Sequence, residues 1–177
     1  KSTEDICAYM VIGGIEQWVQ IHGHRSENPV LLFLHGGPGG SSRFASAAWK
    51  PWERYFRVVH WDQRGAGLTF ARNGEAGCGA LSIERMVADG IELVEWLRHS
   101  ATVEKILLVG HSWGSILGIH MIKRRPDLFS AYVGTGQFVD RRRNEEVNYS
   151  KQLEEAERAS NEEAVSALTA IGPPPYA

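Results

Sequence analysis

A serine inside a glycine-bounded pentapeptide is the residue of this sequence best suited to nucleophilic chemistry. Residues 110–114 read GHSWG, after an apolar run at 105–109 and before a second apolar stretch at 113–125. A G-x-S-x-G sequence between a buried strand and a helix is typical of a strained turn that exposes the serine hydroxyl at the positive end of the helix. The alternative is a glycine-rich strand-to-helix turn with an incidental serine. We predict a nucleophile at Ser112, in a turn shaped by Gly110, His111 and Gly114.

A second glycine-rich turn, HGGPGG at 35–40, follows the apolar run at 30–34. A serine that attacks a carbonyl needs two backbone N–H groups aimed at the developing oxyanion. One normally comes from the residue after the nucleophile and one from the turn after an earlier strand, so we expect Trp113 and Gly37 to supply them. A phosphate-binding loop is the alternative, but the Lys-Ser/Thr ending of a P-loop is absent. The other residues that shape this turn are His35, Gly36 and Pro38.

A third motif, WDQRGAGLT at 61–69, follows another apolar run at 57–61. Its Asp62 and Arg64 carry opposite charges and are able to pair, which would hold the loop beside the site. We expect both residues to support the loop rather than to take part in catalysis.

The elements that position these motifs alternate between short apolar runs and longer amphipathic stretches, which indicates an α/β fold with a mostly parallel sheet and flanking helices. The first two strands read as an antiparallel hairpin around Gly13 and Gly14. Ser82 is available as the N-cap of the first predicted helix. The predicted strands are 7–13, 15–21, 30–34, 57–61, 105–109 and 131–133, and the predicted helices are 82–98 and 113–125.

The composition changes near residue 138, so we expect two parts: residues 1–137 as the N-terminal part of the core and residues 138–177 as the beginning of a helical cap. Residues 140–177 carry 5 basic and 8 acidic side chains and few large apolar ones. A solvated helix is predicted at 142–159. Ser160 begins a capping-box sequence for a second helix, which Gly172 and the following prolines end.

The three motifs, HGGPGG, WDQRGAG and GHSWGS, in this order and spacing, resemble the α/β-hydrolase superfamily and most closely its proline iminopeptidase-like branch. The resemblance runs from about residue 15 to 137. It implies a serine hydrolase that forms an acyl-enzyme on Ser112, with the N–H groups of Gly37 and Trp113 as the oxyanion hole. The third motif departs from the usual DQRGSGRS form at Ala66, Leu68 and Thr69. Epoxide hydrolases and haloalkane dehalogenases resemble the same scaffold but place an aspartate where this chain has Ser112.

A serine nucleophile needs a histidine base and an orienting acid, which in this fold follow it in the chain. The one histidine after Ser112 is His120, which lies eight residues on in the same predicted helix, so we expect it to be a core or surface residue. The family's fold also has two further strands, and without them the last predicted strand would be a hydrophobic edge. We therefore expect the acid and the base to lie outside this chain, in a C-terminal portion that is absent or forms a second chain.

Composition excludes several other classes. The chain has 177 residues and a formal net charge of −2, so we expect no nucleic-acid and no membrane partner. No apolar run reaches the roughly 18–20 residues that cross a bilayer, and no signal peptide is evident, which favours a cytoplasmic location. Cys7 and Cys78 are read as reduced thiols in no metal-ligand spacing. No cofactor and no metal is expected.

The predicted substrate is a small molecule or short peptide with an ester or amide bond, with an N-terminal proline peptide as one candidate. The alternatives are a carboxylesterase or acyltransferase on an unrelated small molecule, and a catalytically silent binding protein with the same fold.

Overall fold

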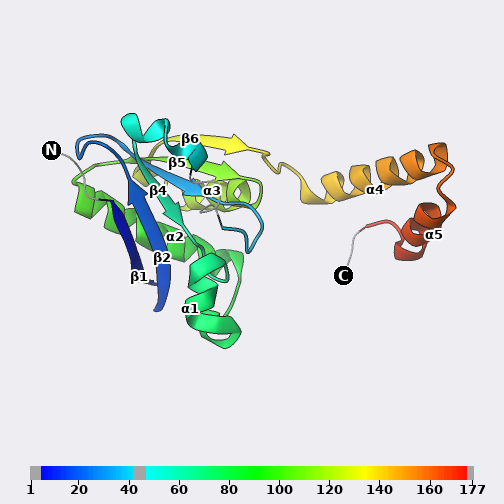
Figure 1. The fold of residues 1–177 in the computed structure, drawn as a ribbon, viewed down its shortest axis with the longest axis horizontal. Coiled ribbons are helices and arrows are strands. Elements are labelled where there is room, and N and C mark those ends of the chain that lie inside the picture. Colours follow the sequence, from blue (N-terminus) through cyan, green and yellow to red (C-terminus); the bar gives the residue numbers. More distant parts are fainter. Residues whose placement is uncertain (1–4, 42–46, 175–177) are drawn as a thin grey trace. The chain divides into compact units, whose positions relative to one another are not determined.

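The computed structural model describes residues 5–41 and 47–174 and divides into two units, Lys1–Gln137 and Phe138–Ala177. In the first unit the described strands form one sheet in the order β1-β2-β4-β3-β5-β6 (Figure 1). β1 and β2 pair antiparallel, β2 meets β4 antiparallel, and β4, β3, β5 and β6 run parallel. The strands are β1 (Ile6–Ile12), β2 (Ile15–His22), β3 (Val30–Leu34), β4 (Arg57–Trp61), β5 (Ile106–His111) and β6 (Phe129–Thr135).

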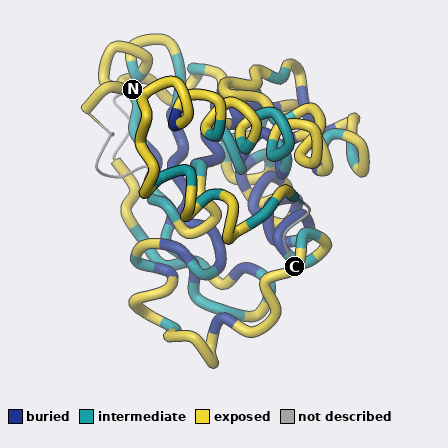
Figure 2. Tube along the Cα trace, turned by 90° about the vertical axis from the view of Figure 1, so that its right-hand side faces the viewer, coloured by how far each residue is buried: buried dark blue, intermediate teal, exposed yellow. Residues whose placement is uncertain are grey.

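The predicted mostly parallel α/β sheet is therefore confirmed, and each strand has a sequence reason. Gly13 and Gly14 turn the β1–β2 hairpin with positive φ values of 57° and 79°. The central strands β3, β4 and β5 are apolar and mostly buried (Figure 2), as parallel strands covered on both faces must be. β6 extends beyond the predicted 131–133, because Phe129 is buried at its start after the short 3-10 helix η3 (Pro126–Leu128).

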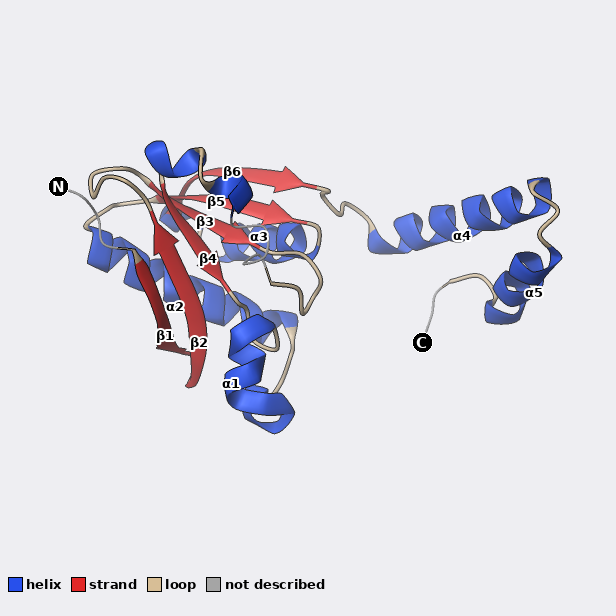
Figure 3. Ribbon diagram, viewed as in Figure 1, coloured by secondary structure: helices blue, strands red, loops and turns tan. Residues whose placement is uncertain are grey.

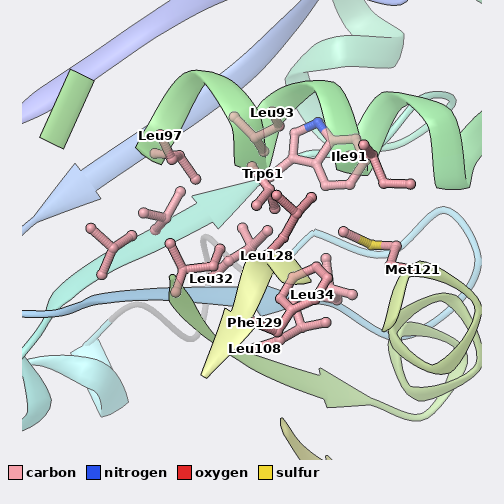
Figure 4. Close-up of a cluster of buried hydrophobic side chains, with 14 of the residues drawn as sticks. Leu32, Leu34, Trp61, Ile91, Leu93, Leu97, Leu108, Met121, Leu128 and Phe129 are labelled. Atoms are coloured by element: carbon pink, nitrogen blue, oxygen red, sulfur yellow. The ribbon is translucent and has the colours of Figure 1, made fainter. Parts of the chain in front are cut away.

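Two helices cover one face of this sheet (Figure 3). α2 (Ile83–Ala101) begins where the sequence predicts, because the Ser82 hydroxyl accepts a hydrogen bond from Arg85 N at 3.1 Å. α3 (Trp113–Arg124) falls on the apolar stretch predicted as a helix at 113–125, and it is buried on one side only, because Ile119 is exposed. The core between these helices and the sheet is drawn in Figure 4 and includes Leu32, Leu34, Trp61, Leu93, Leu97, Leu108 and Met121.

The opposite face of the sheet carries a smaller apolar cluster of Leu31, Phe33, Val58 and Val109. Side chains on a strand alternate between faces, so Leu31 and Phe33 lie here while their neighbours in β3 face α2 and α3. Trp49 packs on Phe33 with ring centroids 4.4 Å apart, and the ring of His60 lies 5.8 Å from that of Trp49. Burial in this cluster lowers the pKa of His60 from its ordinary 6.5 to about 4, helped by repulsion from His22 and opposed by Asp62.

Helix α1 (Gly67–Cys78) was not predicted from the sequence, and the segment around it contains glycines at 65, 67, 74, 77 and 79. The Asp62 carboxylate accepts a hydrogen bond from Leu68 N at 2.8 Å, in the first turn of α1. A negative charge at a helix N-terminus is favourable, and it satisfies one N–H that has no partner within the helix. Gly74, with φ 67°, interrupts the helical backbone inside α1.

A buried ionic network around Asp89 joins the hairpin, α1 and α2. Arg64 Nε donates to Asp89 Oδ2 at 2.7 Å, and Arg85 Nη2 lies 2.8 Å from Asp89 Oδ1. Arg64 also donates to the carbonyl oxygens of Gly13 and Cys78. The predicted pairing of Arg64 with Asp62 is wrong. The Asp62 carboxylate accepts hydrogen bonds from Ser41 and Leu68, whereas the long side chain of Arg64 reaches the carboxylate of Asp89, which is fully buried.

The second unit consists of α4 (Arg141–Arg158) and α5 (Glu162–Ile171). Asp140 caps α4 by accepting from Arg143 N. The N-cap of α5 is Asn161, whose side chain accepts from Ala164 N at 3.0 Å, so the prediction of Ser160 as the capping residue is wrong by one position. Among the described residues, no helix is both long enough and apolar enough to span a bilayer.

Replacing Asp89 with Ala tests the buried network. We expect the free energy of unfolding to fall by about 3–5 kcal/mol, because the buried Arg64 loses its counterion. Urea unfolding followed by circular dichroism measures the change. The control is Glu16→Ala, which removes the partner of Arg72 from an exposed ion pair; it should leave the unfolding midpoint nearly unchanged. Equal effects of the two substitutions would contradict the role of the network.

Stability should also decrease as the pH falls from about 6.5 to 4, because the unfolded chain protonates His60 while the folded chain keeps it neutral. The loss of unfolding free energy attributable to His60 is on the order of 3 kcal/mol over this interval. The measurement is a series of urea titrations between pH 7 and pH 4. His60→Phe keeps a ring in the cluster and should flatten the pH dependence; an equally steep profile in this variant would show that other groups cause it.

Candidate active site

Ser112 stands between β5 and α3 in a backbone conformation that L-residues rarely adopt, with φ 52° and ψ −117°. The surroundings hold this conformation in place. Ser112 N donates to Thr135 O at 2.9 Å, and Ser112 O accepts from both the N–H and the hydroxyl of Ser115, at 2.9 and 2.6 Å. Backbone strain of this kind costs of order 1–3 kcal/mol and persists only where neighbouring contacts enforce it.

The two flanking glycines have no room for a side chain. A Cβ at Gly110 would lie 2.5 Å from Gly114 O, and a Cβ at Gly114 would lie 2.1 Å from Leu34 O and 2.8 Å from His35 O. Because Gly110 has no side chain, the two ends of the turn around Ser112 lie in contact. Because Gly114 has none, α3 packs directly on the backbone at the end of β3. The spacing of the pentapeptide therefore follows from backbone clearance on both sides of Ser112.

The HGGPGG turn lies against Ser112. A Cβ at Gly36 would be 3.2 Å from the Ser112 Cβ and 3.3 Å from the His111 ring. Gly37 has φ 129°, and a side chain there would approach Gly39 N and Gly40 N to 2.7 Å. The peptide bond between Gly37 and Pro38 is cis. The structure thus brings the two predicted glycine-rich turns together, with Gly36 at the point of contact.

The two histidines beside Ser112 have different partners. His35 is buried; its Nε2 accepts from Gln63 N at 3.2 Å, so its Nδ1 carries the proton and donates to Gly36 O at 2.8 Å. Burial lowers the pKa of His35, and the bond to Gly36 opposes this effect. His111 is exposed, and its Nδ1 lies 3.0 Å from Thr135 Oγ1. Both nitrogens of His35 are engaged, which makes it a structural residue of the turn.

Trp113, the second predicted oxyanion donor, is the first residue of α3, where backbone N–H groups have no partner within the helix. Its indole Nε1 donates to Gln63 Oε1 at 3.1 Å. Asp62, one residue earlier in the chain than Gln63, accepts from the Ser41 hydroxyl at 2.6 Å and from Leu68 N, so it holds the loop and the start of α1. Arg64 supports the same loop from the side of Asp89.

The other histidines lie in different surroundings. His120 is exposed in α3, about 12 Å along the helix axis from Ser112 at 1.5 Å per residue. His60 is buried in the aromatic cluster, and His22 pairs with Asp5 at 3.1 Å. His24 and His99 lie in the loop after β2 and in the last turn of α2. In the part of the chain that the structure describes, no three His, Cys, Asp or Glu side chains gather as a metal site requires.

Three residues at this site were missed by the sequence analysis: Ser115, Thr135 and Gln63. Ser115 and Thr135 fix the Ser112 backbone, and Gln63 contacts both glycine-rich turns. Gln63 stands between two residues that were singled out, Asp62 and Arg64, and an uncharged polar residue two positions after a buried strand was the available signal. No sequence pattern indicated the contacts of Ser115 and Thr135, because these depend on how β6 and α3 pack.

A strained serine at a strand-to-helix turn, a glycine-rich turn packed against it and a mostly parallel sheet define this chain as an α/β-hydrolase. A family model described as serine aminopeptidase, S33, matches residues 25–161, and the chain belongs to that family. The family and the relatives below indicate a hydrolase.

Among curated relatives, the probable aminopeptidase YbaC of Bacillus subtilis is 38% identical over 99% of this chain and 55% of its own length. The proline iminopeptidase of Arabidopsis thaliana is 32% identical over 71% of this chain and 30% of its own length. The chain therefore spans about half or less of the length of these relatives.

Solved structures show the same fold. A proline iminopeptidase-related protein of Thermus thermophilus superposes with a TM-score of 0.69 at 24% identity, covering 94% of this chain and 56% of that one. An epoxide hydrolase of Vigna radiata superposes with a TM-score of 0.55 at 29% identity, over 74% of this chain and 40% of that one.

Substituting Gly114 with Ala tests the contact between α3 and β3. Gly114 has an ordinary helical backbone, so the new Cβ acts only through its collision with Leu34 O, and we expect a loss of about 3 kcal/mol of unfolding free energy. Gly14→Ala is the control: nothing lies within 4 Å of its Cβ, and its positive φ costs only about 1–2 kcal/mol. Urea midpoints compare the two. A Gly114→Ala protein as stable as wild type would exclude the close contact.

Proposed function

We propose that this chain carries the nucleophile and the oxyanion hole of a serine hydrolase that acts through an acyl-enzyme on Ser112. The observation that carries the proposal is the strained Ser112 backbone at the N-terminus of α3, in contact with the Gly36–Gly37 turn. Strain at a functional turn is retained when it exposes a reactive group. The positive end of α3 also favours the negative charge that develops during acyl transfer.

In the proposed first step the Ser112 oxygen attacks the carbonyl carbon of an ester or amide and forms a C–O bond. The carbonyl electron pair moves to its oxygen, where the N–H groups of Gly37 and Trp113 donate to it, and the serine proton passes to a histidine base. Collapse of this intermediate breaks the bond to the leaving group, which takes that proton. Water then repeats the sequence on the acyl-enzyme, which releases the acid and restores the Ser112 hydroxyl.

The histidine base and its acid are proposed to come from a C-terminal portion of the hydrolase, whether or not it is a separate chain. The surroundings of the histidines support this proposal: His35 has both nitrogens engaged, and His120 lies two turns along α3. The length of the relatives, of which this chain covers 30–55%, leaves room for such a portion.

A short peptide with a free N-terminus, including one that begins with proline, is the proposed substrate class, since the relatives are called aminopeptidase and proline iminopeptidase. A small ester is the second candidate, because the same acyl-enzyme chemistry cleaves both bonds. Epoxide opening is not proposed, although the fold superposes on an epoxide hydrolase, because those relatives of the fold use an aspartate at the position of Ser112.

A fluorophosphonate probe tests the proposal, because it phosphonylates a serine only when a base activates the hydroxyl and an oxyanion hole accepts the phosphoryl oxygen. We expect stoichiometric labelling at Ser112 in the assembled protein, read from peptide masses, and none in Ser112→Ala. Ser130→Ala, which removes from β6 a hydroxyl that donates to Ile106 O at 3.2 Å, should label as wild type does.

An intact mass of the same preparation shows whether a second polypeptide accompanies this chain. Labelling that fails while the C-terminal portion is present would favour the alternative, a catalytically silent binding protein. Labelling of a preparation that contains this chain alone would show that the base lies within it and would contradict the proposed external base.

A further inference from the structure

Gln63 is a fully buried amide whose side chain bridges the two turns of the site (0% exposed). Its Nε2 donates to His35 O at 3.3 Å, two residues before Gly37, and its Oε1 accepts from the Trp113 indole at 3.1 Å. Its backbone N–H donates to the His35 ring, which in turn bonds to Gly36 O. A third loop, after β4, therefore ties together the turn after β3 and the start of α3.

We propose that Gln63 is a positioning residue, which holds the backbone N–H groups of Gly37 and Trp113 at the separation that one oxyanion requires. The inference rests on the function proposed above. It assigns Gln63 a role in the proposed oxyanion hole that the sequence motifs did not indicate. An oxyanion hole works only if both donors reach the same oxygen, at about 2.7–3.1 Å. Gly37 and Trp113 belong to different elements, so their separation depends on what joins those elements.

Two of the contacts between these elements restrain this separation. One is the backbone contact of Gly114 with Leu34 and His35, which limits how closely α3 approaches β3. The other is Gln63, which restrains the same elements through hydrogen bonds to each. A primary amide carries an NH2 donor group and a carbonyl acceptor on one planar group, which is what a carbonyl on one side and an indole N–H on the other require. Glutamate keeps the acceptor but loses the donor, and leucine loses both.

The chain contains a second bridge of the same kind away from the glycine-rich turns. Gln17 is equally buried; its Oε1 accepts from the Trp61 indole at 2.9 Å and its Nε2 donates to Ile12 O at 3.0 Å. Its Nε2 also donates to Asp89. Gln17 joins the β1–β2 hairpin to β4 and α2, so Gln17→Leu removes a comparable buried bridge without touching the proposed oxyanion donors.

The experiment compares Gln63→Leu, Gln63→Glu and Gln17→Leu in the assembled protein, with p-nitrophenyl acetate and its thiono analogue as substrates. Sulfur accepts hydrogen bonds more weakly than oxygen, so the ratio of the two acylation rates reports on the oxyanion hole. We expect Gln63→Leu to lower kcat for the oxygen ester by about 10- to 100-fold with little change in KM, and to bring the rate ratio closer to one. Gln63→Glu keeps the acceptor for the Trp113 indole but places a carboxylate oxygen against His35 O, so it should also lower kcat and bring the rate ratio closer to one.

Gln17→Leu should lower the urea midpoint but leave kcat and the rate ratio unchanged. Indole N–H exchange measured by NMR provides a readout independent of activity: the Trp113 proton should exchange faster in Gln63→Leu, and the Trp61 proton in Gln17→Leu. The positioning role is overturned if Gln63→Leu keeps the wild-type kcat and rate ratio. It is also overturned if Gln63→Leu and Gln17→Leu alter kcat and the rate ratio equally. In either case the hydrolase function stands. If wild-type protein neither hydrolyses the ester nor is labelled at Ser112 by the fluorophosphonate, the proposed function fails, and the inference with it.

Discussion

The backbone contact between α3 and the end of β3 is the constraint on which the rest of the site depends. α3 lies this close to the sheet because position 114 has no side chain to collide with Leu34 O. One turn further along the helix, the absence of a side chain at Gly118 leaves room for the ring of Tyr132 in β6, which a Cβ would approach to 2.8 Å. A helix seated on two glycines brings its N-terminus to the carboxyl ends of the parallel strands, and this places Ser112 beside Gly36. Packing and chemistry at this point have the same cause.

Buried polar groups complete what the apolar core leaves undetermined. The core between the sheet and helices α2 and α3 fixes the layers but not the loops, because apolar contacts have no direction. Hydrogen bonds do have direction, and the structure uses them where chain segments far apart in the sequence must meet: Asp89 joins the hairpin to α2, and Gln63 joins the loop after β4 to the two glycine-rich turns. A buried charge or amide without its partner is costly, so each of these bridges also selects one arrangement of the loops.

The central strands, α2 and the pentapeptide around Ser112 could be predicted because local sequence carries them: apolar runs, a serine N-cap and glycines at fixed offsets. Where local signals were ambiguous the prediction was wrong. α1 was missed because glycine is a poor helix former and three of its residues are glycines, although the Asp62 carboxylate stabilises its first turn. Arg64 was paired with a neighbour in the chain, whereas its partner Asp89 lies 25 residues further on, in a helix that packs beneath it. The N-cap of α5 is Asn161 and not Ser160. Serine and asparagine are comparable N-caps, so the sequence did not distinguish the two adjacent positions.

The sequence by itself determined the succession of the strands and of every α-helix except α1 along the chain, and the presence of a serine between two glycines, because backbone clearance and apolar periodicity are properties of neighbouring residues. It did not determine which elements those glycines face. Only the tertiary structure decided that Gly36 lies against Ser112, that Thr135 O holds the Ser112 amide, and that Gln63 bridges to Trp113. These contacts join residues 23 to 76 positions apart in the chain, and their geometry is set when strands from distant segments become neighbours in one sheet.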